Sequence, residues 1–163
     1  MMKKTILILL MALIMISIPA SAWGFTTPSI SKNHGVFYGL IASDSKIAIG
    51  GEFGFTNELA VCAALEDKVK IGLKYELNSS VAILGGMIES SPYIGLNGAT
   101  ALSKDLAGMG ELDFTINNSK VNFVYNLGLK YNLPQNIDLR GGLRGNLGEG
   151  NQVLFALGIG YKF

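Results

Sequence analysis

Apolar and polar residues alternate with a period of two along most of the chain after residue 35. In the segment 121–131 the odd positions are Val, Phe, Tyr or Leu, whereas the even positions carry Asn, Gly and Lys together with Val124. Successive side chains of a β-strand point to opposite faces, so this pattern predicts a strand with one apolar and one mostly polar face. The segment 153–163 repeats the pattern.

We expect ten such strands, joined by short turns rich in Asp, Asn, Ser and Lys, which are typical of β-hairpins. The predicted strands are 36–42, 47–55, 59–66, 69–77, 80–88, 93–102, 106–116, 121–131, 137–145 and 153–163. No segment has the length and pattern of a parallel-sheet crossover. The sequence therefore predicts an all-β, antiparallel up-and-down β-barrel of ten strands with short loops on both sides. Merging the weaker strands would give eight.

Four of the predicted strands end with an aromatic residue, one further residue, and then Leu or Phe. The four pairs are Phe53 with Phe55, Tyr75 with Leu77, Tyr131 with Leu133, and Tyr161 with Phe163. The repeating unit is two strands long, which predicts that every second strand ends at the same edge of the sheet, with rings at that edge.

Residues 1–22 have the features of a secretory signal peptide. Lys3 and Lys4 precede an apolar run over 6–18, and small residues at Ala20 and Ala22 fit a cleavage site. The apolar run is shorter than the ~20 residues that a membrane-spanning helix needs. We therefore expect a cleaved signal peptide at 1–22. A periplasmic N-terminal extension or a plug would follow at 23–34, and the barrel domain at 35–163.

The composition excludes several classes of protein. Hydrophobic residues make up 49% of the chain, which argues against disorder, and a formal charge of +1 without a basic cluster argues against nucleic-acid binding. One Cys and one His exclude a disulfide framework and most metal sites. We expect no cofactor and no metal. Cys62 should be a buried free thiol on a face of small residues.

The direction in which the apolar face points decides between a soluble and a membrane barrel. All twelve charges in the predicted strands lie on the polar face, as six cations and six anions interleaved with small residues. A cation facing lipid costs about 2–4 kcal/mol, and buried charges are tolerable when they are paired. The pattern therefore favours a transmembrane β-barrel, with lipid outside and a narrow, charged lumen inside. The residues predicted to line this lumen are Glu52, Lys70, Lys74, Glu111, Asp113, Lys130, Asp138, Arg140 and Arg144.

The last strand resembles the assembly signature of small Gram-negative outer-membrane β-barrel proteins. The residues that carry the resemblance are Phe155, Leu157, Ile159, Tyr161 and Phe163. It implies an outer-membrane location, contact with outer-membrane lipids, and recognition by the outer-membrane barrel insertion machinery. We expect a monomer with both chain ends on the periplasmic side, because the strand number is even. The short loops depart from the family's pattern.

The expected function is that of an integral outer-membrane barrel with a structural role or a narrow pore for the passive passage of ions or small solutes, and not that of an enzyme. One alternative is a secreted soluble lipocalin-like barrel that binds an apolar ligand. A second is an outer-membrane hydrolase, for which His34 would be the candidate base. Glu111 and Asp113 could form a carboxylate pair, but we expect each to meet Lys130, Arg140 or Arg144.

Overall fold

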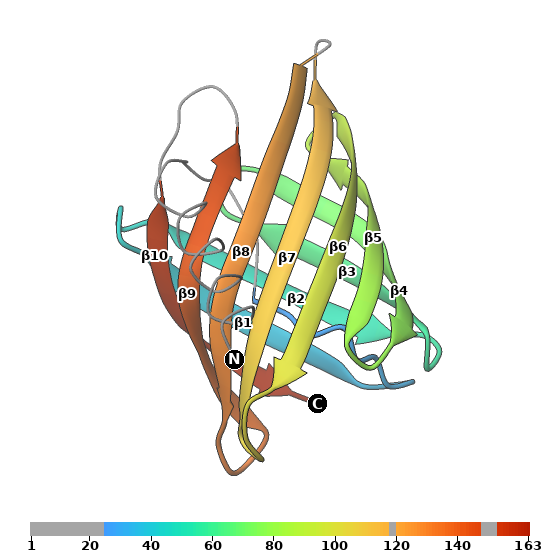
Figure 1. The fold of residues 1–163 in the computed structure, drawn as a ribbon, viewed down its shortest axis with the longest axis vertical. Coiled ribbons are helices and arrows are strands. Elements are labelled where there is room, and N and C mark those ends of the chain that lie inside the picture. Colours follow the sequence, from blue (N-terminus) through green and yellow to red (C-terminus); the bar gives the residue numbers. More distant parts are fainter. Residues whose placement is uncertain (1–24, 118–119, 148–152) are drawn as a thin grey trace, which may run out of the picture.

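The structure, a computed structural model, describes residues 25–117, 120–147 and 153–163, so the predicted signal peptide lies outside the described residues. It is a closed barrel in which each strand pairs antiparallel with its sequence neighbours and β10 pairs with β1 (Figure 1). The strands are β1 Gly35–Ala42, β2 Ile47–Gly54, β3 Leu59–Leu65, β4 Val69–Asn78, β5 Val81–Ile88, β6 Ser91–Ala101, β7 Leu106–Asn117, β8 Lys120–Asn132, β9 Ile137–Leu147 and β10 Leu154–Lys162.

The prediction of ten antiparallel strands in up-and-down order is confirmed. Each predicted strand is present, and the described bounds differ from the predicted ones by no more than two residues. The eight-strand alternative is wrong, because the weakly alternating β1, β5 and β6 are separate strands that pair with both neighbours. Among the residues that the structure describes, no helix is long and apolar enough to cross a membrane.

The two ends of the barrel sequence meet at the seam between β1 and β10. Gly35 N donates to Phe163 O at 2.9 Å, and Phe163 N donates to Gly35 O at 3.0 Å. The even-numbered strands all end at the edge of the barrel where β1 begins and β10 ends, as the repeat of aromatic pairs predicts. We call this edge the terminal rim and the opposite edge the far rim.

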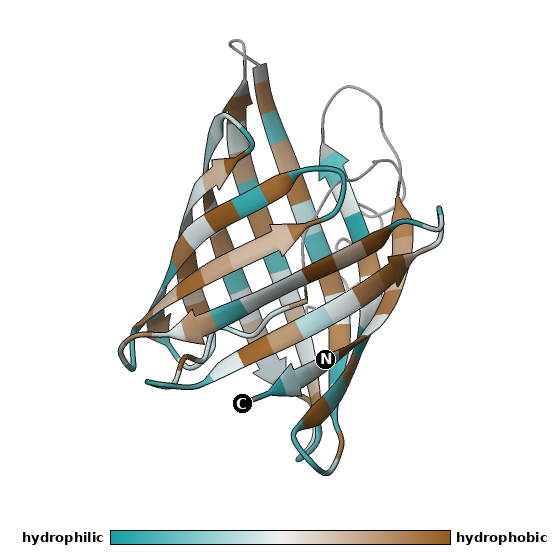
Figure 2. Ribbon diagram, turned by 180° about the vertical axis from the view of Figure 1, so that it is seen from behind, coloured by the Kyte–Doolittle hydropathy of each residue, from teal (hydrophilic) through white to brown (hydrophobic). Residues whose placement is uncertain are grey.

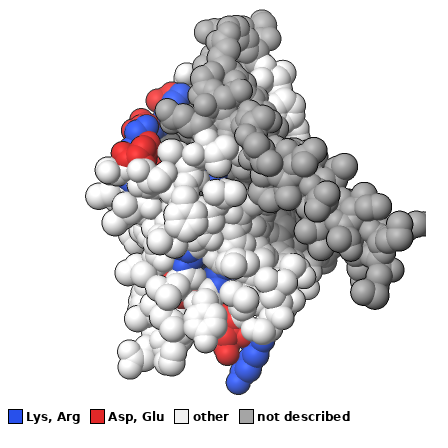
Figure 3. Space-filling model, turned by 60° about the vertical axis from the view of Figure 1, so that its left-hand side comes forward, with Lys and Arg blue, Asp and Glu red and all other residues white. Residues whose placement is uncertain are grey.

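The apolar face of each strand points outward, and the charged face points into the barrel. Ile41, Ile94 and Ile159 are 62%, 61% and 60% exposed, whereas Lys74 and Asp113 are fully buried. Figure 2 shows the apolar residues as bands that recur along every strand in view. Figure 3 shows one face of the molecule, which is mostly uncharged and carries its Asp, Glu, Lys and Arg mainly toward the ends. This distribution is the reverse of that in a soluble barrel with an apolar interior.

Ion pairs outside the barrel interior lie at the far rim. Lys46, in the turn between β1 and β2, contacts Asp44 at 3.5 Å and donates a hydrogen bond to Asp67 in the next turn at this rim. The hydrogen bond from Lys46 to Asp67 raises the pKa of the lysine above its ordinary value. Lys68 contacts Glu89 at 3.2 Å across the neighbouring turns. Because these pairs are exposed, they contribute little to stability.

Some inward-facing glycines make room for aromatic rings. Tyr38 on β1 stands opposite Gly50 on β2, and its ring lies over the glycine. A Cβ atom added at Gly50 would lie 2.5 Å from Tyr38 Cζ and 2.9 Å from the backbone oxygen of Ala63. The sequence Gly50-Gly51 therefore serves close packing inside a strand, as its position within an alternating segment indicates.

We expect the substitution Gly50→Ala to destabilise the barrel by about 1–3 kcal/mol, because the added methyl group overpacks the space under Tyr38. Gly39→Ala is the matched control, since a Cβ atom there would meet nothing within 4 Å. Urea unfolding of the two variants in lipid vesicles measures the difference. Equal stability of both variants would contradict the packing described here.

Candidate functional site

The lumen contains a cluster of buried charge formed by two strands that are not neighbours, β4 and β7, with β5 and β6 between them. Lys70 on β4 places its Nζ atom 2.9 Å from Glu111 Oε1 and 2.5 Å from Asp113 Oδ2, both on β7. The same Nζ atom lies 4.5 Å from the centre of the Tyr93 ring. All three charged side chains are almost completely buried. One ammonium group thus bridges two carboxylates that would otherwise repel each other.

The expectation that Glu111 and Asp113 meet Lys130, Arg140 or Arg144 is wrong, because their partner is Lys70. The lysine side chain is long enough to reach past the two intervening strands, β5 and β6. Charges therefore pair between strands that are not neighbours, and the alternation along each strand does not show which of these strands come close together.

Three further pairs neutralise charge inside the barrel. Arg140 donates to both carboxylate oxygens of Asp138, at 2.7 and 2.8 Å. Lys74 donates to Glu52 of β2, and Arg144 donates to Glu66, the residue after β3. Taking a charge out of water costs several kcal/mol unless an opposite charge and hydrogen bonds compensate for it.

The nine residues predicted to line the lumen all point into the barrel. Glu52 and Lys130 are partly buried, and the others are buried: Lys70, Lys74, Glu111, Asp113, Asp138, Arg140 and Arg144. Cys62 is a free thiol in the same interior, only partly buried. The structure thus brings these side chains together in one lumen, while their part in any function stays a prediction.

The chain before β1 also lies inside the barrel. Backbone oxygens of residues 25–27 accept hydrogen bonds from inward-facing side chains: Phe25 O from Arg140 Nη1 at 2.8 Å, Thr26 O from Asn97 Nδ2 at 3.1 Å, and Thr27 O from Lys74 Nζ at 3.0 Å. Ile30 N donates to the Glu76 carboxylate at 2.6 Å. We call residues 25–30 the inner segment.

The Phe25 ring is the apolar anchor of the inner segment. It is 1% exposed, and a Cβ atom added at Gly128 on β8 would lie 2.7 Å from it. Gly142 stands opposite Gly128 on β9, so two glycines meet in this part of the wall. The missing side chain of Gly128 leaves room for the ring, and a Cβ atom at Gly142 would instead meet the backbone of Leu127 and Gly128.

From the sequence, residues 23–34 could form either a periplasmic extension or a plug. The part that the structure describes, from Phe25 onward, enters the lumen. These residues show no alternation from which a contact could be predicted. A signal for it in the sequence is Gly128 at an inward position of an otherwise regular strand, but the sequence does not show what fills the space beside this glycine.

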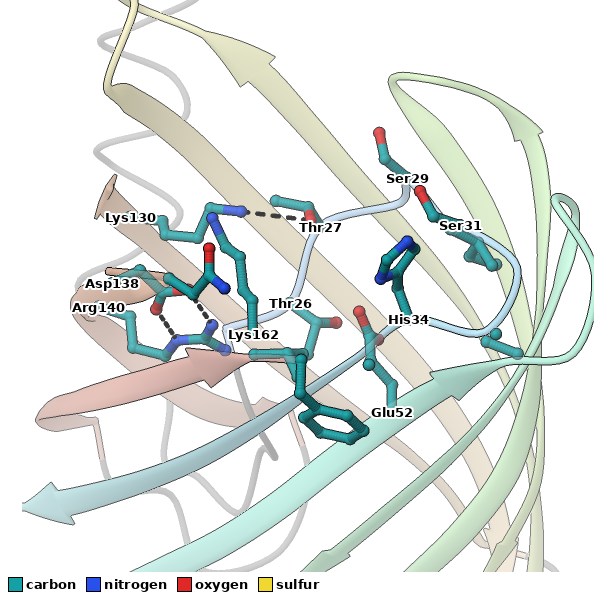
Figure 4. Close-up of a pocket in the computed structure, with 17 residues that line it drawn as sticks. Thr26, Thr27, Ser29, Ser31, His34, Glu52, Lys130, Asp138, Arg140 and Lys162 are labelled. Atoms are coloured by element: carbon teal, nitrogen blue, oxygen red, sulfur yellow. Dashed lines mark hydrogen bonds and ion pairs between the residues drawn. The ribbon is translucent and has the colours of Figure 1, made fainter. Parts of the chain in front are cut away.

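A cavity of about 340 Å³ opens at the terminal rim between the inner segment and the barrel wall (Figure 4). Its lining includes Lys130 and Lys162, the Arg140–Asp138 pair and Glu52. Lys130 Nζ lies 3.4 Å from Thr27 Oγ1, and Lys162 Nζ donates to Asn132 Oδ1 at 2.6 Å.

His34 lines this cavity together with Ser31 and Glu52 (Figure 4). Within the described part of the chain, no hydrogen bond joins the His34 imidazole to Ser31 or to Glu52, so there is no assembled nucleophile and base. No group of three or more His, Cys, Asp and Glu residues among the described residues could hold a metal ion.

We expect the substitution Lys70→Met to destabilise the barrel by about 3–5 kcal/mol, because it leaves two carboxylates buried without a counter-ion. Combining it with Glu111→Gln and Asp113→Asn should recover most of the loss, since the remaining groups are neutral. Denaturant unfolding in vesicles measures both variants. A loss that persists undiminished in the triple variant would mean that shape, rather than charge, makes Lys70 important.

Comparisons with family models and with curated proteins give no match. Several solved structures are similar to this chain at low sequence identity, and three of them are described here by name. The KdgM porin is 12% identical with a TM-score of 0.48, over 80% of this chain and 99% of its own. The Yersinia pestis outer membrane protein Ail is 12% identical with a TM-score of 0.47, over 81% of this chain and 100% of its own. A de novo designed transmembrane β-barrel is 17% identical with a TM-score of 0.45, over 83% and 99%.

Proposed function

We propose that the protein is an integral outer-membrane β-barrel protein with a structural role and a lumen that is closed in the state described. The observation that carries this proposal is the inverted distribution of polarity. Large apolar side chains cover the outside, and ion pairs fill the inside. In water this surface would expose an extensive apolar area, whereas in a bilayer it contacts acyl chains.

The same observation opposes the soluble lipocalin-like alternative. A barrel that carries an apolar ligand needs an apolar interior with free volume. Here the inward positions hold Lys74, Asp113 and Arg144, and the inner segment occupies part of the space that a ligand would need. No feature of the described residues favours the hydrolase alternative either.

Aromatic rings at the terminal rim support a membrane position. The rings of Phe53 and Phe163 stack with centroids 6.5 Å apart, and Phe53 meets Phe55 edge to face at 5.8 Å. Tyr161 and Phe163 are about half exposed. Aromatic residues at strand ends form interfacial girdles in membrane barrels. With the signal peptide expected from the sequence, the terminal rim would face the periplasm.

The interior argues for closure rather than an open channel. Four carboxylate–cation clusters and the inner segment occupy the lumen between the two rims. Ions could pass only if these side chains or the inner segment moved. A narrow passive pore is therefore a state that would require rearrangement, and the closed structural barrel is our proposal.

We expect Leu157→Arg, in the middle of β10, to cost about 2–4 kcal/mol or to block membrane insertion, because the cation would face acyl chains. Leu102→Arg, just after β6 at the terminal rim, is the matched control and should cost about 0–1 kcal/mol. The two leucines are equally exposed, at 58% and 57%. Envelope fractionation, with comparison of heated and unheated samples on a gel, measures assembly. A soluble barrel would tolerate both substitutions equally.

In planar lipid bilayers we expect the purified protein to show no steady current at moderate voltage, since ion pairs and the inner segment fill the lumen. Deletion of residues 25–30 should produce discrete conductance steps, because it frees volume and leaves Lys74 and Arg140 with fewer partners. A steady open current through the unaltered protein would overturn the closed barrel and favour the narrow pore.

A further inference from the structure

Two cations in the cavity at the terminal rim differ from the other charges of the barrel interior. Lys70, Lys74, Arg140 and Arg144 each contact a carboxylate. Neither Lys130 nor Lys162 has a carboxylate partner among the described residues. Lys130 reaches the Thr27 hydroxyl at 3.4 Å, and Lys162 reaches the Asn132 amide oxygen at 2.6 Å.

The two lysines share one region of the cavity although they lie on different strands. The Lys162 side chain extends from β10 across β9 to Asn132 of β8, and Asn132 is two residues from Lys130 on the same inward face. Figure 4 shows both ammonium groups pointing toward the same part of the cavity.

The carboxylates in the cavity wall do not neutralise this pair. Both oxygens of Asp138 accept hydrogen bonds from Arg140, and Glu52 is bound by Lys74. Lys130 and Lys162 are therefore two cations in a partly buried cavity whose side-chain carboxylates, Asp138 and Glu52, are bound by other cations. Two like charges held close together with limited solvation favour the binding of an opposite charge.

We propose that this cavity binds a small dianion, one that carries a phosphate group or two carboxylates, between Lys130 and Lys162. Lysine ammonium groups bind phosphate and carboxylate as point charges. Thr27 and Ser31 of the lining add hydroxyl groups that can donate hydrogen bonds to the anion. The cavity volume, about 340 Å³, lies at the low end of the range for small-molecule sites.

The side from which the ligand would arrive rests on the proposed function. If the terminal rim faces the periplasm, the anion comes from there. Binding itself requires only the folded barrel, so it can be measured in detergent without reference to the membrane.

Isothermal titration of the full protein, purified from the envelope in a zwitterionic detergent, tests the proposal. Inorganic phosphate, succinate and chloride are titrated separately at constant ionic strength. We expect saturable one-site binding of phosphate or succinate, and binding of chloride weaker by about tenfold or more, because a monovalent ion meets one ammonium group. Comparison of phosphate with succinate identifies the type of dianion. No saturable binding of either would overturn the proposal.

Variants locate the site. Lys130→Gln and Lys162→Gln should each weaken binding about tenfold, and the double variant should abolish it. Lys104→Gln, in the turn between β6 and β7 at the same rim but outside the cavity lining, is the matched control and should bind as the unaltered protein does. Undiminished binding by the double variant would overturn the assignment to this cavity.

Two measurements keep the test independent of folding defects. Migration of unheated samples on a gel shows whether each variant forms the barrel, and the bound dianion should raise the melting temperature of the unaltered protein and not of the double variant. A negative titration would overturn the anion site and leave the membrane proposal intact. Equal tolerance of Leu157→Arg and Leu102→Arg would overturn the membrane proposal and leave the anion site intact.

Discussion

The pairing of charge inside a narrow barrel is the constraint on which the rest of the structure depends. Because the apolar face of every strand points outward, the charged face of every strand points into the lumen. A buried charge is costly unless an opposite charge meets it. Lys70 on β4 neutralises two such buried charges, because its ammonium group contacts two carboxylates on β7. The interior is consequently a set of ion pairs rather than an apolar core.

The inner segment belongs to the same solution. Arg140 and Lys74 each have N–H groups beyond those that their carboxylate partners accept. Arg140 donates one of these to the backbone oxygen of Phe25, and Lys74 donates one to the backbone oxygen of Thr27. Phe25 in turn needs an apolar place, which Gly128 provides by having no side chain. The polar backbone and the ring thus use two different features of the wall, and both hold the segment inside the barrel.

The cavity at the terminal rim contains two inward-facing lysines that have no carboxylate partner among the described residues. Lys130 and Lys162 meet hydroxyl and amide oxygens but no carboxylate. A position where charge is left uncompensated in an otherwise paired interior is a position that favours a ligand of opposite charge. This reasoning links the proposed anion site to the physical rule that governs the remainder of the lumen.

The sequence by itself determined the bounds of the strongly alternating strands and the face on which each charge lies, because strand periodicity is a local property of the chain. The structure was needed to exclude eight strands, since β1, β5 and β6 alternate weakly. The sequence located β8 and β10 within one or two residues and placed Glu111, Asp113 and Arg144 on the polar face. Only the tertiary structure decided that Lys70 is the partner of Glu111 and Asp113, and that Phe25 lies against Gly128. Those contacts join residues far apart in the chain, and they depend on the diameter and register of the closed barrel, which no local pattern encodes.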